Sequence, residues 1–131
     1  MADRQVLYIE DNFHNRRLVR KALESRGFVV LEAADGVGGL ALLRAVRPPL
    51  VLMDIGLPDI DGLGVVAQIR ADPELAATPV IALTASAMPG DRERFLAAGC
   101  DDYLSKPIQL LALIEMVERY CPEGAGLTPP R

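Results

Sequence analysis

Acidic residues follow directly after a strongly apolar stretch in the middle of the chain. Residues 50–62 read LVLMDIGLPDIDG, so Asp54 ends the apolar run and Asp59 and Asp61 follow it closely. An aspartate at the end of a buried segment has a fixed backbone, and its carboxylate can act as a nucleophile. Asp59 lies in a predicted loop, and Asp61 precedes Gly62 and a helical pattern, which is typical of a helix N-cap. Asp54 is therefore the candidate for chemistry.

Polar residues also follow the other short apolar runs, and they add two carboxylates, a hydroxyl and an ammonium group: Glu10, Asp11, Thr84 and Lys106. The carboxyl ends of parallel strands meet at one edge of a sheet, so these groups are expected to gather there. Two carboxylates ~4 Å apart repel by about 4 kcal/mol at an effective dielectric of ~20. Lys106 offsets part of this repulsion, and Mg²⁺ suits the remainder. A lysine and Mg²⁺ together favour transfer of a phosphoryl group to Asp54.

Short apolar runs alternate with stretches of helical spacing along the chain. The runs are Val6–Ile9, Phe28–Leu31, Leu50–Met53, Val80–Leu83 and, more weakly, Tyr103–Leu104. Apolar residues recur one turn apart after each run, for example at Val65, Val66 and Ile69. This alternation predicts an α/β fold with a single five-stranded parallel sheet and helices on both faces. The runs lack polar alternation, as is typical of strands buried on both sides.

Length and composition predict one domain that spans residues 1–121, followed by a flexible tail or truncated linker at residues 122–131. A net charge of −4 and the absence of tryptophan argue against direct nucleic-acid binding. No apolar run approaches the ~20 residues that span a membrane, and the first residues are too polar for a signal peptide. Cys100 and Cys121 lack a metal-binding spacing, so we expect free thiols and a cytoplasmic protein.

Four motifs, in order and at predicted strand ends, make the chain resemble the receiver domains of two-component response regulators. They read YIEDN (8–12), VLMDIGLPDIDG (51–62), ALTASA (82–87) and DDYLSKP (101–107). The resemblance covers nearly the whole chain and extends to DivK-type stand-alone receivers and to the receiver domains of hybrid kinases. It implies a flavodoxin-like (βα)5 fold with strand order 2-1-3-4-5.

The resemblance also implies how the acidic residues act. Asp54 would take a phosphoryl group from a phosphohistidine on a sensor histidine kinase or a histidine phosphotransfer protein. Mg²⁺ would bind to Asp11, Asp54 and the backbone carbonyl of Gly56, with Glu10 contributing directly or through water.

Three further residues receive roles from the resemblance. Lys106 would pair with the acceptor carboxylate and then with the phosphoryl group, and its bond to Pro107 is expected to be cis. Thr84 would turn toward the phosphoryl group, and Tyr103 would turn inward as a switch. The signal would leave through the face formed by the fourth helix, the fifth strand and the fifth helix, to a protein effector or to a second copy in a homodimer.

Several alternatives stay open or are disfavoured by particular residues. The chain is either a stand-alone switch or a receiver domain cut from a hybrid histidine kinase or multidomain regulator. An aspartate-nucleophile phosphatase needs a second aspartate two residues after the nucleophile, where this chain has Gly56. A flavodoxin-type phosphate loop conflicts with Glu10 and Asp11. We therefore expect a domain that assists its own phosphorylation and dephosphorylation, and not an enzyme with a separate substrate.

A basic group on the first predicted helix has two interpretations. It comprises Arg16, Arg17, Arg20 and Lys21. The group is either a solvated helix face, with an Arg20–Glu24 ion pair one turn apart, or a surface for docking a kinase or phosphotransfer helix bundle.

Overall fold

In the part of the chain that the computed structural model describes, residues 4–85 and 88–121, five strands alternate with five helices. The strands are β1 (Gln5–Ile9), β2 (Val29–Ala33), β3 (Val51–Asp54), β4 (Val80–Thr84) and β5 (Asp102–Ser105). The helices are α1 (Phe13–Glu24), α2 (Gly36–Val46), α3 (Gly62–Ala71), α4 (Asp91–Ala97) and α5 (Leu110–Tyr120). The predicted strands are confirmed, with ends that differ by one or two residues.

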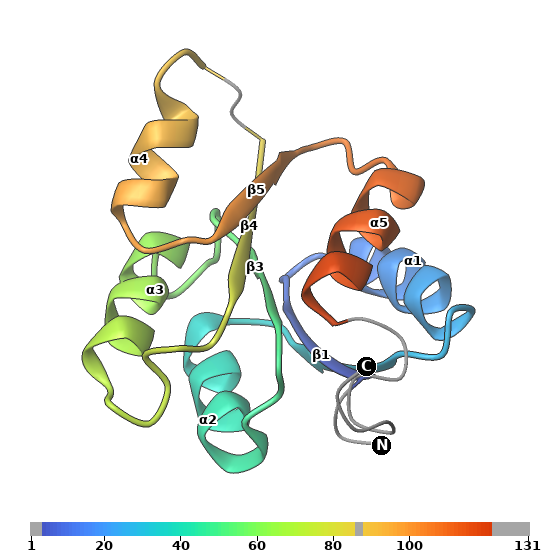
Figure 1. The fold of residues 1–131 in the computed structure, drawn as a ribbon, viewed down its shortest axis with the longest axis horizontal. Helices are drawn as coiled ribbons and strands as arrows, with labels where there is room; N and C mark the ends of the chain where they lie inside the picture. The colour runs from blue at the N-terminus through green and yellow to red at the C-terminus, as the bar shows by residue number, and fades with distance from the viewer. Residues whose placement is uncertain (1–3, 86–87, 122–131) are drawn as a thin grey trace, which may run out of the picture.

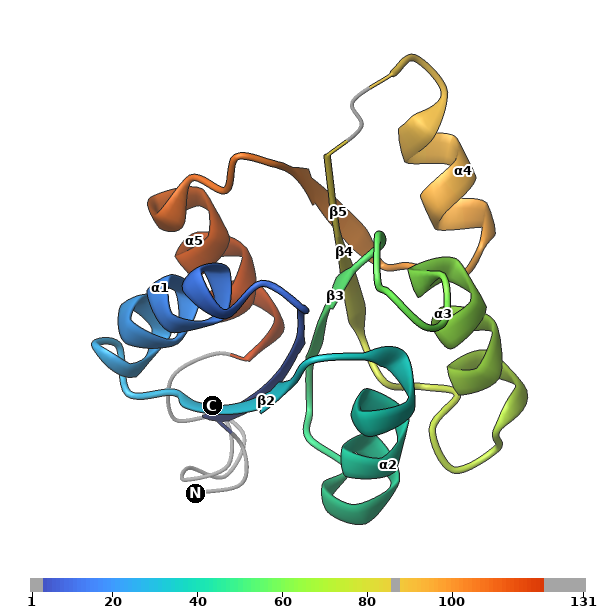
Figure 2. The same ribbon diagram turned by 180° about the vertical axis from the view of Figure 1, so that it is seen from behind.

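The strands form one parallel sheet in the order β2-β1-β3-β4-β5. Helices α1 and α5 cover one face of the sheet, and α2, α3 and α4 cover the other (Figure 1). The view from behind shows the same two layers with the sheet between them (Figure 2). The predicted flavodoxin-like fold, with helices on both faces, is therefore confirmed.

The side chains of β1 point alternately into the apolar layers on the two faces of the sheet. Val6 and Tyr8 point to the layer under α1 and α5, whereas Leu7 and Ile9 point to the layer under α2 and α3. All of these side chains are fully buried. Successive side chains of a strand face opposite sides of its sheet, so the unbroken apolar run seen in the sequence fills both layers.

Aspartates begin two of the helices at the carboxyl edge of the sheet. The side chain of Asp35 accepts a hydrogen bond from the Gly38 N–H at 2.7 Å and caps α2. Asp61 accepts from the Leu63 N–H at 3.3 Å and caps α3, which confirms the role predicted for it. Both side chains satisfy N–H groups that a helix leaves without a partner in its first turn.

Two further points concern the length of the helices and the C-terminal tail. None of the helices in the described residues is both long enough and apolar enough to span a membrane. The tail predicted at residues 122–131 lies outside the described residues, so it stays a prediction.

Gly62 allows the loop after β3 to fold back onto the strand. A Cβ atom there would lie 2.6 Å from the Asp54 carbonyl oxygen and 2.6 Å from the Ile55 Cα, both of which are backbone atoms. We expect Gly62→Ala to lower the free energy of unfolding by about 1–3 kcal/mol, because the backbone must shift to admit the methyl group. Urea unfolding measures this loss.

Gly56 provides the control in the same loop. A Cβ atom there would meet nothing within 4 Å, and the residue has no positive φ angle. Gly56→Ala should therefore leave the unfolding free energy within about 0.5 kcal/mol of the parent chain. Equal losses in the two variants would contradict a steric role for Gly62.

Candidate functional site

A cleft of about 450 Å³ opens at the carboxyl edge of the sheet. Among the residues that line it are six of the seven predicted from the sequence: Glu10, Asp11, Asp54, Gly56, Thr84 and Lys106. They come from the ends of β1, β3, β4 and β5 and from the loops that follow. The topology therefore gathers segments that lie far apart in the chain. The seventh residue, Tyr103, lies on β5 and is not part of the lining.

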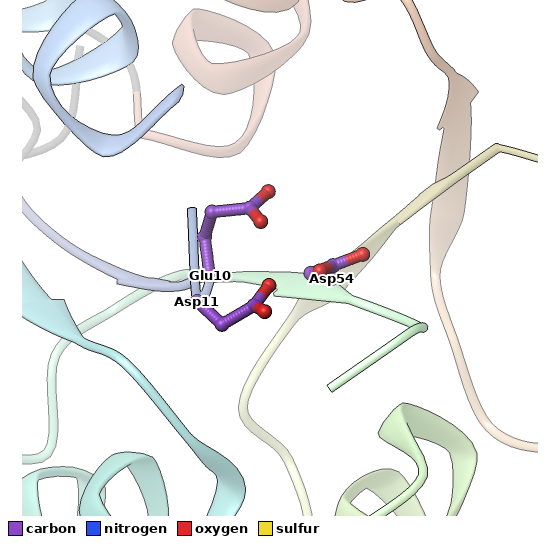
Figure 3. A group of neighbouring side chains, drawn as sticks. All are labelled: Glu10, Asp11 and Asp54. Carbon is purple, nitrogen blue, oxygen red and sulfur yellow. The ribbon is translucent and has the colours of Figure 1, made fainter. Parts of the chain in front are cut away.

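Three carboxylates form the acidic part of the cleft. Glu10, Asp11 and Asp54 each place an oxygen within 4.8 Å of the others. Their side chains extend into the space beyond the ends of β1 and β3 (Figure 3). The two strands are paired, with Ile9 opposite Met53, so the residues that follow emerge side by side. Glu10 and Asp54 are buried and Asp11 is exposed, an arrangement that could hold a metal ion.

Lys106 connects two of these carboxylates. Its Nζ donates to Glu10 Oε1 at 3.0 Å and to Asp54 Oδ1 at 3.1 Å. Partial burial opposes its charge, but the hydrogen bond with Glu10 and the charge of Asp54 outweigh it and raise the pKa of the ammonium. Lys106 therefore stays protonated at neutral pH. One ammonium faces three carboxylates, so negative charge remains in the cleft.

The backbone around Lys106 is fixed at the same edge. The Lys106 N–H donates to the Thr84 carbonyl at 2.7 Å, which joins the ends of β4 and β5. The peptide bond between Lys106 and Pro107 is cis, as predicted.

Tyr8, a residue that the sequence analysis missed, donates a hydrogen bond to the buried Glu10 carboxylate. The Tyr8 hydroxyl donates to Glu10 Oε1 at 3.2 Å, and the Asn12 N–H donates to Oε2 at 3.2 Å. Burial raises the pKa of Glu10, and the donors Lys106 and Asn12 offset part of this effect. Tyr8 lies on β1 and Glu10 directly follows that strand, two residues later. The two-residue period of a strand was therefore the signal that could have paired them.

Arg16 anchors the end of β1 and is not simply part of a solvated basic face. It donates to the Glu10 carbonyl at 2.7 Å and to Glu32 Oε1 at 3.1 Å, and its side chain is only 16% exposed. The predicted pair of Arg20 and Glu24 is present at 3.3 Å, and Arg20 also contacts Glu32 at 2.7 Å. Two of the four basic residues of α1 thus tie this helix to β2.

Asp59 is a second residue whose role the sequence did not reveal. It follows Pro58 in the loop after β3, and its carboxylate accepts from the N–H groups of Gly36 at 2.8 Å and Val37 at 3.0 Å. These hydrogen bonds lower the pKa of Asp59. No local sequence pattern predicts a contact between this loop and a helix that lies more than twenty residues earlier in the chain.

The two predicted switch residues lie on the side of the cleft formed by β4 and β5. Thr84 ends β4 and is 4% exposed. Tyr103 is half-buried on β5, and its ring packs against Phe95 of α4 with 5.7 Å between the ring centroids. The ring of Tyr103 therefore connects β5 with α4, outside the lining of the cleft.

Comparison with known proteins identifies the family. A model described as the response regulator receiver domain matches residues 6–118. The chain belongs to this family. The receiver domain is 43% identical over 117 residues to the polar-differentiation response regulator DivK of Brucella anthropi, across 89% of this chain and 95% of that protein.

Solved receiver structures agree with this assignment. The chemotaxis response regulator CheY4 of Vibrio cholerae matches with a TM-score of 0.83 and 28% identity, over 88% of this chain and 97% of that one. The receiver domain of a Pseudomonas aeruginosa sensor histidine kinase, solved with a magnesium ion in its active site cleft, matches with a TM-score of 0.82 and 37% identity, over 90% and 97% of the two chains. This chain is thus a phosphoacceptor domain of two-component signalling, as predicted.

The receiver's buried tyrosine gives a prediction about the stability of the site. Tyr8→Phe keeps the ring in the core but removes the hydroxyl that donates to the buried Glu10 carboxylate. We expect the free energy of unfolding to fall by about 1–2 kcal/mol, because a buried charged group loses a hydrogen bond. Urea denaturation at neutral pH measures the change.

Tyr120→Phe is the matched control. Its hydroxyl donates to the Asp101 carbonyl at 3.3 Å from a partly exposed position on α5. We expect a change below about 0.5 kcal/mol. A loss in Tyr8→Phe no larger than in this control would show that Glu10 does not depend on the hydroxyl.

Proposed function

We propose that Asp54 is the phosphoacceptor of this receiver domain and that it takes a phosphoryl group from a phosphohistidine on a sensor histidine kinase or a histidine phosphotransfer protein. The observation that carries the proposal is the contact of Lys106 with Asp54 Oδ1 at 3.1 Å, inside a cleft where three carboxylates converge. Asp54 is fixed at the end of a fully buried strand.

Hydrogen bonds at Asp54 indicate which oxygen reacts. Lys106 and the Gly56 N–H both donate to Oδ1, which makes Oδ2 the candidate nucleophile. Oδ2 would form the new O–P bond while the N–P bond of the phosphohistidine breaks, and the electron pair of that bond returns to the imidazole nitrogen. The Lys106 ammonium would stabilise negative charge on the phosphoryl oxygens, and the Thr84 hydroxyl would donate to one of them; both residues line the cleft.

The donor set of the cleft fits Mg²⁺. Carboxylate and carbonyl oxygens are the ligands this cation prefers, and the negative charge that Lys106 leaves uncompensated favours a divalent ion. Asp11, Asp54 and the Gly56 carbonyl would hold the ion. Glu10, whose two oxygens already accept hydrogen bonds, would contribute directly or through water. When bound, Mg²⁺ neutralises charge shared by the acceptor and the phosphoryl group.

The same site supports a switch and not turnover of a separate substrate. Phosphorylation adds charge next to Lys106 and Thr84. Thr84 would then move toward the phosphoryl group and Tyr103 would turn inward from its place beside Phe95. The face formed by α4, β5 and α5 would carry the signal to a protein effector or to a second copy in a homodimer. Leu111 of α5 is 69% exposed, and Met88, which precedes α4, is 66% exposed.

The upstream partner would dock beside the acceptor on α1. Phe13 is 66% exposed and lines a groove with three basic residues (Arg17, Arg20 and Lys21) and two acidic ones (Glu24 and Glu32). Both glutamates pair with Arg20, so Arg17 and Lys21 supply positive charge beside the apolar ring. This combination suits a helix bundle with an apolar face and an acidic rim. We also propose a cytoplasmic location, which the free thiols of Cys100 and Cys121 support.

Phosphorylation with a small donor tests the acceptor. We expect the chain to gain one phosphoryl group by intact mass when it is incubated with Mg²⁺ and acetyl phosphate, and Asp54→Asn to gain none, because an amide oxygen cannot form the acyl phosphate. Asp61→Asn is the control, since asparagine also caps helices and Asp61 lies outside the cleft. Equal labelling of Asp54→Asn and the parent chain would rule out Asp54.

Lys106→Gln separates binding of the cation from transfer of the phosphoryl group. Loss of the ammonium leaves more negative charge in the cleft, so Mg²⁺ should bind as tightly as before or more tightly. The rate of phosphorylation should fall by roughly 100-fold, because one donor to the phosphoryl oxygens is lost. Calorimetric titration and the time course of intact mass measure the two effects. Arg44→Gln, at an exposed position on α2 outside the cleft, should change neither. An unchanged rate in Lys106→Gln would contradict the role of Lys106.

A further inference from the structure

The loop that leaves the acceptor strand is fastened to the rest of the fold at two points. At its base, the Gly62 N–H donates to the Ile55 carbonyl at 3.0 Å and closes the loop on itself. At its tip, Asp59 accepts from the N–H groups of Gly36 and Val37 at the start of α2, at 2.8 and 3.0 Å. Both carboxylate oxygens of Asp59 are used, so the tip is fixed in orientation as well as in position.

Packing confirms that the loop tip and the start of α2 lie against each other. A Cβ atom on Gly36 would lie 2.9 Å from Val65 Cγ2 and 3.2 Å from Ile60 Cβ. Only a glycine lets the helix approach this closely. The N–H groups of Gly36 and Val37 also lower the pKa of Asp59, so the carboxylate is charged where the helix dipole is positive.

Gly56 lies between the two fastened points and lacks packing of its own. It is exposed, and a Cβ atom there would meet nothing within 4 Å. Its N–H nevertheless donates to Asp54 Oδ1 at 3.2 Å, and its carbonyl belongs to the proposed cation site. The orientations of its two flanking peptide groups therefore depend on how the chain is held on either side of Gly56.

We propose that Asp59 is a positioning residue for the acceptor site. By clamping the loop to α2, it holds the backbone on both sides of Gly56, so that the N–H of Gly56 reaches Asp54 and its carbonyl can face the cation. Asp59 does not line the cleft, so it acts only through the backbone between Gly56 and itself. The inference rests on the proposed function, because it assigns a supporting residue to the same cation and acceptor site.

Asp35 supplies the control that separates positioning from helix capping. Both aspartates accept hydrogen bonds from the first turn of α2, Asp35 from the Gly38 N–H at 2.7 Å and Asp59 from Gly36 and Val37. Asp35 belongs to the turn that precedes α2, whereas Asp59 belongs to the loop after β3 that also contains Gly56. If Asp59 merely stabilised α2, replacing Asp59 or Asp35 would have the same effects on Mg²⁺ affinity and on amide exchange at Gly56.

The experiment compares Asp59→Ala, Asp59→Asn and Asp35→Ala in the full chain without phosphorylation. Calorimetry measures Mg²⁺ affinity, and amide hydrogen exchange without metal measures protection at Gly56. We expect Asp59→Ala to weaken Mg²⁺ binding by roughly 10-fold, as is typical when a group that orients a ligand is lost. Gly56 exchange should accelerate as well. Asp59→Asn, which keeps one acceptor oxygen, should fall between Asp59→Ala and the parent chain. Asp35→Ala should keep the parent's Mg²⁺ affinity and Gly56 exchange.

The outcomes separate the clamp, which is the contact of Asp59 with the N–H groups of Gly36 and Val37, from the proposed cation and acceptor site. Parent-like Mg²⁺ affinity and Gly56 exchange in both Asp59 variants would overturn the clamp and leave the proposed function standing. Equal weakening in Asp35→Ala and Asp59→Ala would also overturn it, because helix stability would then explain both. A parent chain that binds no Mg²⁺ would overturn the proposed cation site and the inference together. If Asp59→Ala does not fold, Asp59→Asn alone decides, since asparagine remains a good helix cap.

Discussion

The site depends on the mutual repulsion of three carboxylates and on the ammonium group that offsets part of it. Glu10, Asp11 and Asp54 place oxygens within 4.8 Å of one another, and two of these side chains are buried. Strand order makes this possible, because β1 and β3 are neighbours. Lys106 directly follows β5, with β4 between it and β3, so only a long side chain reaches both Glu10 and Asp54. The same reach carries it past Thr84 at the end of β4.

The three carboxylates stay close together because the apolar layers on both faces of the sheet hold the backbone in place. The three central strands are almost completely buried, and their apolar side chains fill both layers. The contacts behind the cleft then fix the acidic side chains one by one. Tyr8 and Asn12 hold the carboxylate of Glu10, while Arg16 holds its carbonyl. These donors satisfy the buried Glu10 carboxylate and fix its orientation.

The sequence was sufficient to predict the sheet and the members of the cleft, for a simple reason. Strands of a parallel sheet all end at one edge, so polar residues such as Asp54 and Lys106 that follow apolar runs must converge. The supporting contacts were beyond reach because they depend on three-dimensional distances between loops and helices. Arg16 looked like one of several basic residues on a helix face, yet it bridges two strands. Asp59 looked like a loop residue, yet its partners are N–H groups of α2.

These contacts differ on the two sides of Asp54. On the side of α2, two carboxylate oxygens of Asp59 and the close approach at Gly36 hold the loop after β3. On the other side, Lys106 contacts the acceptor directly and shares a backbone hydrogen bond with Thr84. Within the proposed function, a new charge on Asp54 changes the balance of forces on Lys106 first. Because the contacts at Asp59 and Gly36 hold α2 and the loop after β3 together, the response would pass into β4, β5 and the ring of Tyr103, which packs against Phe95 of α4.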